Sequence, residues 1–341
     1  MAAKERQGKR GHFPRRSRWK FVIIAVCVIA FAVLGLYLHF RTQDAQPVEV
    51  GNEVDVGLGY REIVYEGKKY RYNERITTIV YAGVDADGSL TVSSKYANAP
   101  LADSISVIVL DEYHHRMSII ALSRDTMTGI HKYTLDGKDR GVFTDHLGFA
   151  YAYGEGGRVS GMNLCEAISD LLCNVPVRSY VVTSRASIPV IADIIGPVEV
   201  TVPNNDIADE GFVEGETVVI DGSNLETFIR SRDTGKDLSN VGRMERQRAY
   251  IEAVAGKLTD YLTANSSEAW DKIMQAEKIA NTSITRSSYL NLTKKLKNLQ
   301  FGNSNYYTLE GQNVVGPKYD EFYPDLSQVK KLVVDLFYIE Q

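Results

Sequence analysis

Short apolar runs, rich in Ile and Val and bounded by polar residues, recur along this 341-residue chain. Such runs predict strands at 76–84, 105–110 and 117–123. The last two are separated by the polar stretch DEYHHR, which indicates a hairpin. Its adjacent His114 and His115 are expected to be solvated turn residues, because neighbours on a turn point apart and do not converge on a metal.

The second half of the chain mixes helix and strand periods. Residues 177–203 read as a strand, a short apolar helix and a second strand, with Gly196-Pro197 as the break. Core packing explains this aliphatic stretch, and the wall of a lipid-binding slot is the alternative. The other predicted elements are helices at 162–174, 244–259, 264–281, 287–299 and 326–338 and a strand at 306–310. This alternation predicts an α/β fold with a central mixed sheet.

The N-terminal part has the pattern of a membrane anchor. Residues 21–38 contain no charge over eighteen positions, enough helix to cross the roughly 30 Å hydrocarbon core. Eight basic residues precede the run, so the N-terminus is expected in the cytoplasm and the rest outside the cell. A cleaved signal peptide is the alternative, but the bulky residues at 36–40 offer no small-x-small cleavage site.

These patterns predict four regions in order. They are a basic cytoplasmic tail (1–20), one transmembrane helix (21–39), a juxtamembrane stalk with one short hairpin (40–72) and a single extracytoplasmic domain (73–341).

Charge is unevenly distributed along the chain. Residues 1–41 hold nine Lys or Arg and one Glu, a net +8, whereas the whole chain carries −4, so the remainder carries −12. Such an acidic body argues against nucleic acid as a partner. Cys165 and Cys173 lie on one helix about 12 Å apart along its axis, too far for a disulfide, and buried free thiols are expected.

Five arginines stand within the segment FIRSRDTGKDLSNVGRMERQRAY (228–250). They are Arg230, Arg232, Arg243, Arg246 and Arg248. The run ETFIRSR is predicted to be a strand, which would put Arg230 and Arg232 on one face. Arg243 and Gln247 are one turn apart where a helix begins. Arginine forks and a helix N-terminus suit phosphate; the alternative is a set of surface salt bridges, which we favour for Arg248.

Carboxylates stand at the ends of other predicted strands. Asp85 follows the strand at 76–84, Asp103 precedes the one at 105–110, and Arg124-Asp125 follows the one at 117–123. Carboxylates near phosphate-binding arginines are typical ligands of Mg²⁺, which shares its coordination with substrate phosphates.

With these residues assembled, the chain resembles the LytR-CpsA-Psr family of bacterial cell-envelope proteins. The resemblance is carried by IVYAGVDAD, LADSISVIVLDEYHHRMSIIALSRDTM, HLGFAYAYGEGG, ADIIGPVEVTVP and FIRSRDTGKDLSNVGRMERQRAYIEAV. These segments span about residues 79–254 in the family's order, and the single N-terminal anchor also fits.

The resemblance implies a three-layer α/β/α domain that holds a polyprenyl pyrophosphate by its tail in an apolar pocket. It implies a phosphotransferase that moves a glycopolymer, such as teichoic acid or capsular polysaccharide, from that lipid to peptidoglycan at the cell membrane. Its pyrophosphate ligands would be Arg124, Arg230, Arg232, Arg243, Arg246 and Gln247. Asp85 and Asp103 would hold Mg²⁺, and Arg124, Arg230, Arg232 and Asp237 would be catalytic, with Asp237 or Asp103 as the base.

The chain departs from the family pattern at three places. Leu101 and Ala102 stand where an arginine often precedes the aspartate, His146 and Phe149 stand where Lys and His are usual, and Asn240 replaces an aspartate. These departures keep two alternatives open: a non-catalytic, membrane-tethered binder of prenyl phosphates or anionic glycans, and a simple pyrophosphatase.

Overall fold

The computed structural model of the protein describes Val48–Glu49 and residues 61–341, except 89, 91, 234, 265–269 and 272–279. The predicted tail and membrane span lie outside these residues. Among the described residues, no helix is both long and apolar enough to cross a bilayer. The chain from Val48 to Gln341 forms one compact unit.

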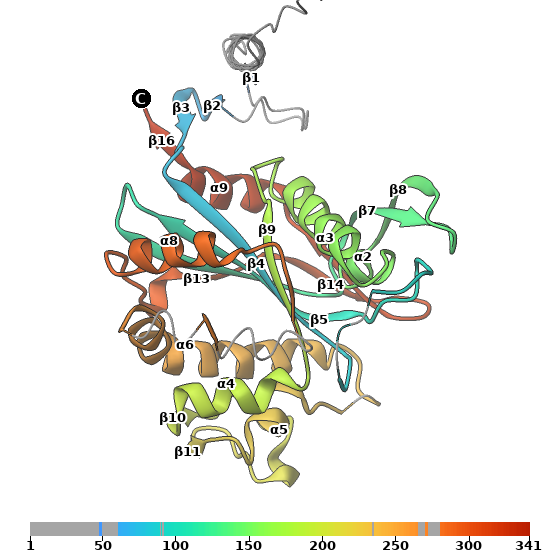
Figure 1. Cartoon of the computed structure of the whole chain (residues 1–341), viewed down its shortest axis with the longest axis vertical. Coiled ribbons are helices and arrows are strands. Elements are labelled where there is room, and N and C mark those ends of the chain that lie inside the picture. The colour runs from blue at the N-terminus through green and yellow to red at the C-terminus, as the bar shows by residue number, and fades with distance from the viewer. Residues whose placement is uncertain are drawn as a thin grey trace, which may run out of the picture. The chain divides into compact units, whose positions relative to one another are not determined.

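A six-stranded mixed sheet lies at the centre of this unit (Figure 1). In spatial order its strands are β12 (Ala280–Thr282), β9 (Ser179–Ser184), β4 (Ile76–Val84), β5 (Ala102–Asp111), β6 (Arg116–Leu122) and β13 (Tyr306–Thr308). The β4–β5–β6 meander is antiparallel, whereas β9 and β13 run parallel to their neighbours β4 and β6. The predicted α/β class with a mixed central sheet is confirmed.

Helices cover both faces of the sheet, because alternate residues of one strand point to opposite sides. Ile120 and Leu122 of β6 belong to the main core, with α3 (Arg158–Leu171) and α9 (Leu326–Phe337). Ile119 and Ala121 instead pack with Met244 and Ile251 of α6 (Asn240–Ala264), on the opposite face. In Figure 1, α3 and α9 lie above the sheet and α6 lies below it.

A second apolar cluster lies beyond α6. It joins α6 to α4 (Ser187–Ile195), β10 (Val198–Thr201), β11 (Thr217–Ile220) and α5 (Leu225–Arg230). Phe212 and Phe228 are its largest aromatic contact, with ring centroids 5.2 Å apart. This cluster fixes α5, and therefore the arginine-rich segment that follows it, against the N-terminal part of α6.

Three hairpins surround the central sheet. The first, β2 (Glu62–Tyr65) and β3 (Lys68–Tyr72), pairs at its sides with β1 (Val48–Glu49) and β16 (Tyr338–Glu340). Its turn residues Glu66 and Gly67 have φ of 49° and 77°, as two-residue hairpin turns require. The others are β7 (Met127–Tyr133) with β8 (Asp139–His146), and β14 (Gly311–Val315) with β15 (Asp320–Pro324). The hairpin predicted within 40–72 is confirmed, and its Ile63 and Tyr72 belong to the main core.

Three elements differ from their predictions. ETFIRSR is not a strand: residues 225–230 form α5, because Leu225 and Phe228 are one helical turn apart and both buried. The helix predicted to begin at residue 244 begins at Asn240, so Arg243 lies in its first turn. The helix predicted over 264–281 falls mostly outside the described residues, and its last residue, Asn281, belongs to β12.

The helices α3, α8 (Arg286–Leu296) and α9 lie within a few residues of their predicted positions, whereas the short helix α2 (Phe149–Ala152) was not predicted. Cys165 and Cys173 are free and buried as expected. Burial raises the pKa of Cys165 to about 12, so this thiol is chemically inert at neutral pH.

Candidate diphosphate-binding site

The register of the β5–β6 hairpin brings Asp103 and Arg124 together. Ile105 pairs with Leu122, so two residues further out Asp103 lies opposite Arg124. Their side chains form an ion pair, and Arg124 Nε also lies 3.4 Å from Asp125 Oδ1. Arg124 is thereby held at the edge of the sheet.

Gly148 allows a third segment to approach this edge. Its N–H donates to Arg124 O over 2.9 Å, and its carbonyl accepts from the N–H of Ala102 over 3.0 Å. A Cβ at position 148 would lie 2.8 Å from Ala102 O, closer than side-chain carbons approach a carbonyl. Glycine at this position therefore sets the spacing between Arg124 and the start of β5.

Arg230 connects α5 to the end of β4. Its Nη2 lies 2.9 Å from Asp85 Oδ1, and its Nη1 lies 2.8 Å from Glu226 Oε1, one turn earlier on the same helix. All three side chains are partly exposed, so these ion pairs contribute little stability. A phosphate could replace either carboxylate as the partner of Arg230.

Arg243 enters the site from the first turn of α6. Its Nη2 donates to Asp103 O over 2.9 Å and to Asn240 Oδ1 over 2.7 Å, and its side chain is almost fully buried. Its Nε is buried without a hydrogen-bond partner among the residues that the structure describes. Burial lowers the pKa of Arg243 to about 10, and the neighbouring Arg124 and Arg232 act in the same direction.

Compared with Arg124, Arg230 and Arg243, Arg232 makes the fewest hydrogen bonds and ion pairs with described residues. Its Nη1 donates to Ser239 Oγ over 3.3 Å. Burial, followed by repulsion from Arg124, lowers the pKa of Arg232. Within the described part of the chain, neither Arg232 nor Arg243 has a carboxylate within ion-pair distance. Two positive charges therefore lack a directly bonded counterion.

These four arginines line one cavity of about 720 Å³, which we call the arginine cavity. Asp85, Asp103 and Glu226 line it as well. Its volume is within the range of small-molecule sites. The structure thus brings together Arg124, Arg230, Arg232, Arg243, Asp85 and Asp103 from four separate segments, as the sequence predicted.

Arg246 and Gln247 are placed differently. Arg246 is fully buried, and its guanidinium donates to the carbonyls of Phe228 and Ser231 and to Asn204 Oδ1. Gln247 donates to Ile229 O over 3.1 Å. Neither residue lines the arginine cavity. Their placement favours a scaffolding role, in which both hold the segment between Arg230 and Arg232 against α6.

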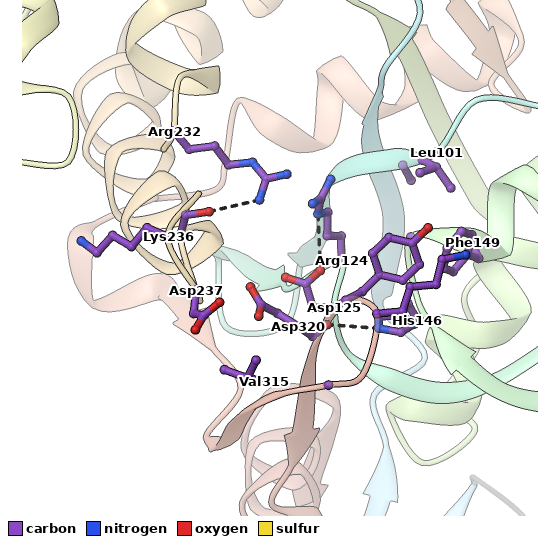
Figure 2. Close-up of a pocket in the computed structure, with 16 residues that line it drawn as sticks. Leu101, Arg124, Asp125, His146, Phe149, Arg232, Lys236, Asp237, Val315 and Asp320 are labelled. Carbon is purple, nitrogen blue, oxygen red and sulfur yellow. Dashed lines mark hydrogen bonds and ion pairs between the residues drawn. The ribbon is translucent and has the colours of Figure 1, made fainter. Parts of the chain in front are cut away.

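Asp237 lies in a second, adjoining cavity of about 320 Å³, the hairpin cavity, bordered by the turn of the β14–β15 hairpin (Figure 2). Leu101, Arg124 and Arg232 line both cavities. Figure 2 shows Asp125, Asp237 and Asp320 around the hairpin cavity, with His146 and Phe149 across from them. Asp237 makes no ion pair with any described residue, whereas Asp103 is paired with Arg124. Because an unpaired carboxylate is free to accept a proton, this difference favours Asp237 over Asp103 as the general base.

Sequence reasoning missed Glu226, Lys318, Tyr319 and Asp320. The turn signal Gly316-Pro317 could have indicated the β14–β15 hairpin that carries the last three. Arg248 is paired with Glu252 at 2.9 Å, one turn along α6, and is a surface salt bridge as expected.

A metal ion would need ligands from outside the protein. In the described part of the chain, no group of three or more His, Cys, Asp or Glu side chains could hold one. Asp85 and Asp103 both face the arginine cavity. Two carboxylates beside a phosphate site fit the way Mg²⁺ is usually bound, with substrate oxygens and water completing its shell. His114 Nδ1 lies 2.6 Å from Oδ2 of the buried Asp111, and the Asp111 carboxylate caps the β5–β6 turn by accepting from the N–H groups of Tyr113 and His114.

Sequence comparison identifies relatives of this chain. A polyisoprenyl-teichoic acid–peptidoglycan teichoic acid transferase TagU of Bacillus cereus is 27% identical over 224 residues, 65% of this chain and 64% of the relative. Its Bacillus mycoides counterpart is 27% identical over 201 residues, 58% and 59% of the two chains. The match therefore spans less than two thirds of these relatives.

Solved structures show the same fold. Bacillus subtilis TagV superposes with a TM-score of 0.56 at 19% identity, over 77% of this chain and 96% of that one. TagT bound to LI-WTA gives 0.57 at 16% identity, over 83% and 98%. The profile of the LytR-CpsA-Psr family (LytR_cpsA_psr) matches residues 50–335, which is most of the chain. The protein is a member of the LytR-CpsA-Psr family.

Proposed function

We propose that this protein is a membrane-anchored phosphotransferase that moves a glycopolymer from a polyprenyl diphosphate carrier to peptidoglycan. The observation that carries the proposal is the pair of guanidinium groups, Arg232 and Arg243, that share the arginine cavity without a carboxylate partner among the described residues. A diphosphate would supply the missing negative charge. Relatives whose names state teichoic acid transfer to peptidoglycan support the choice of substrates.

The reaction we propose is a direct displacement at phosphorus. A hydroxyl oxygen of the acceptor sugar forms a bond to the sugar-linked phosphorus, while the bond from that phosphorus to the bridging oxygen breaks. Polyprenyl phosphate leaves with the bond electrons, and the hydroxyl proton passes to a carboxylate. Such a transfer requires positioning and compensation of phosphoryl charge more than covalent chemistry by the protein.

We assign a role to each residue from the cavity that it lines. Arg124, Arg230, Arg232 and Arg243 bind the phosphate oxygens and compensate charge as the leaving group departs. Asp237 takes the hydroxyl proton, since its carboxylate is unpaired among the described residues and lines the neighbouring cavity. Asp85 and Asp103 would hold Mg²⁺ together with the phosphates, where it would add positive charge beside the diphosphate.

The membrane anchor proposed for residues 21–39 would keep the domain and its lipid donor in one plane. Confinement to the same surface raises the effective concentration of the two partners without any additional contact. The proposed location is the outer face of the cytoplasmic membrane, with the N-terminus inside.

Transfer is tested with the full chain in lipid nanodiscs, a polyprenyl diphosphate-linked glycan and purified peptidoglycan, with Mg²⁺ or EDTA. We expect glycan to become covalently attached to peptidoglycan with Mg²⁺, and much less with EDTA. Tight binding of the lipid without cleavage would instead support a non-catalytic binder. Release of phosphate without glycan on the wall would indicate a pyrophosphatase.

A further inference from the structure

We propose that the hairpin cavity binds the sugar backbone of the acceptor, with Tyr319 as its stacking platform. The inference rests on the proposed function and adds the position and chemistry of the second substrate. The two cavities share Leu101, Arg124 and Arg232. A hydroxyl bound in the hairpin cavity therefore lies next to the arginines that hold the diphosphate.

Aromatic rings form one wall of this cavity. Tyr319 is 48% exposed, and its ring lies 5.7 Å from the His146 ring and 6.0 Å from the Phe149 ring. All three residues line the cavity, as does the 55% exposed Val315. Exposed aromatic surface beside a few polar groups is typical of ligand sites, and the flat C–H face of a sugar packs on such a ring. Lys318 Nζ lies 5.0 Å from the centroid of the Tyr319 ring, so a bound sugar displaces this ammonium group or packs on the opposite face.

The polar groups of the cavity carry both signs. Asp125, Asp237 and Asp320 accept hydrogen bonds, whereas Lys236 and Lys318 donate them. Each sugar hydroxyl both donates and accepts, so this mixture fits a polyhydroxyl chain. Arg124 and Arg232 also line the cavity, so its cationic side chains offset the three carboxylates, and hydroxyl groups rather than charges of the ligand would make most of the polar contacts.

The hairpin is held in place although its β14 strand is exposed along its whole length. His146 Nε2 donates to Asp320 O over 3.1 Å, and Leu238 N–H donates to Asp320 Oδ2 over 2.9 Å. Phe322 N–H donates to Asp125 O over 2.8 Å. These anchors come from β8, from the segment before α6 and from the end of β6. A platform fixed before binding loses little entropy when its ligand arrives.

The test measures two affinities of the full chain in nanodiscs. The probes are peptidoglycan strands stripped of attached polymers and phosphate, and farnesyl diphosphate. The variants are Tyr319→Ala, Tyr319→Phe, and Val315→Asp across the same turn. The matched control is Tyr323→Ala, since Tyr323 is 45% exposed on the same hairpin but does not line the cavity.

We expect Tyr319→Ala and Val315→Asp to weaken strand binding at least tenfold, and Tyr319→Phe and Tyr323→Ala to change it less than twofold. Farnesyl diphosphate affinity should stay within twofold in all four variants, which also reports their folding. The inference is overturned if Tyr319→Ala and Val315→Asp bind strands like the unaltered chain, or if glycerol phosphate oligomers displace the strands from it. Failure of the unaltered chain to bind farnesyl diphosphate would instead contradict the proposed function.

Discussion

The side-chain amide of Asn240 joins Arg243 to Asp125: its Nδ2 donates to Asp125 Oδ2 over 2.7 Å, and its Oδ1 accepts from Arg243 Nη2 over 2.7 Å. A neutral amide can do both because it carries a donor and an acceptor, whereas an ionised aspartate offers only acceptors. Asn240 is also buried. Asn240, which stands where the family usually has an aspartate, therefore has hydrogen bonds at both its amide nitrogen and its amide oxygen.

Asn240→Asp should destabilise the protein at neutral pH. The new carboxylate would lose the donor to Asp125 and stand within hydrogen-bond distance of that like charge. An ion pair with Arg243, whose Nη2 lies 2.7 Å from Asn240 Oδ1, would offset part of this loss, so we expect a net decrease of about 1 kcal/mol in the free energy of unfolding. A proton shared between the two carboxylates would restore a hydrogen bond, so the loss should shrink as the pH falls.

Urea unfolding of the full chain at pH 7 and pH 5 measures this effect. The control is Asn313→Asp on the exposed β14 strand. An equal decrease in the free energy of unfolding in both variants, or a decrease that does not change with pH, would show that the Asn240–Asp125 hydrogen bond does not contribute to stability.

Arg246→Ala should lower the free energy of unfolding but should not remove a side chain that binds phosphate. The substitution removes the side-chain donor to the carbonyls of Phe228 and Ser231 and one of the two donors to Asn204 Oδ1, and we expect a loss of about 3 kcal/mol. At a temperature where the variant remains folded, its affinity for farnesyl diphosphate should lie within about threefold of the unaltered chain. A stable variant with tenfold weaker binding would mean that Arg246 contacts the ligand after all.

The stability that Asp111 gives to the β5–β6 turn should decrease at acid pH. Burial acts to raise the pKa of Asp111, but hydrogen bonds from His114 and Asn73 outweigh it, and the pKa lies below its ordinary value. A lowered folded-state pKa adds stability above the unfolded-state value of about 3.9, and this stability is lost as the pH falls through the folded-state pKa.

Asp111→Asn should therefore cost about 1–3 kcal/mol at pH 7 and progressively less below about pH 4. Denaturant unfolding across pH 3–7 measures the difference, with Asp209→Asn at an exposed position as the control. A difference that stays constant down to pH 3 would contradict the role given to Asp111.

Much of the fold could be predicted because its strands are apolar on both faces. The β4, β5 and β6 strands read as aliphatic runs bounded by polar turns, and they occur close to where they were expected. The turn at 111–116 even determines which strand-end residues face each other, since its register places Asp103 opposite Arg124.

Other parts could not be predicted because local pattern and tertiary packing disagree. ETFIRSR was predicted to be a strand, but its residues up to Arg230 belong to α5, since the helix buries Leu225 and Phe228 against α6. The β14 strand is exposed throughout, so it lacks the apolar alternation that reveals a strand. The sequence places Arg246 among the arginines expected to bind phosphate. Only the three-dimensional packing shows that its guanidinium instead donates hydrogen bonds to backbone carbonyls inside the protein.

The central claim is that the arginine cavity binds a diphosphate, and it is tested most directly by the affinity of Arg232→Ala for farnesyl diphosphate, measured by calorimetry on the full chain in nanodiscs. Arg232 makes one weak internal hydrogen bond, so the variant should fold normally. Losing a charge-assisted hydrogen bond of about 1.5–3 kcal/mol should weaken binding roughly 10- to 100-fold and abolish glycan transfer. The surface variant Arg248→Ala should bind and transfer like the unaltered chain. Equal affinity and full transfer in Arg232→Ala would contradict the account.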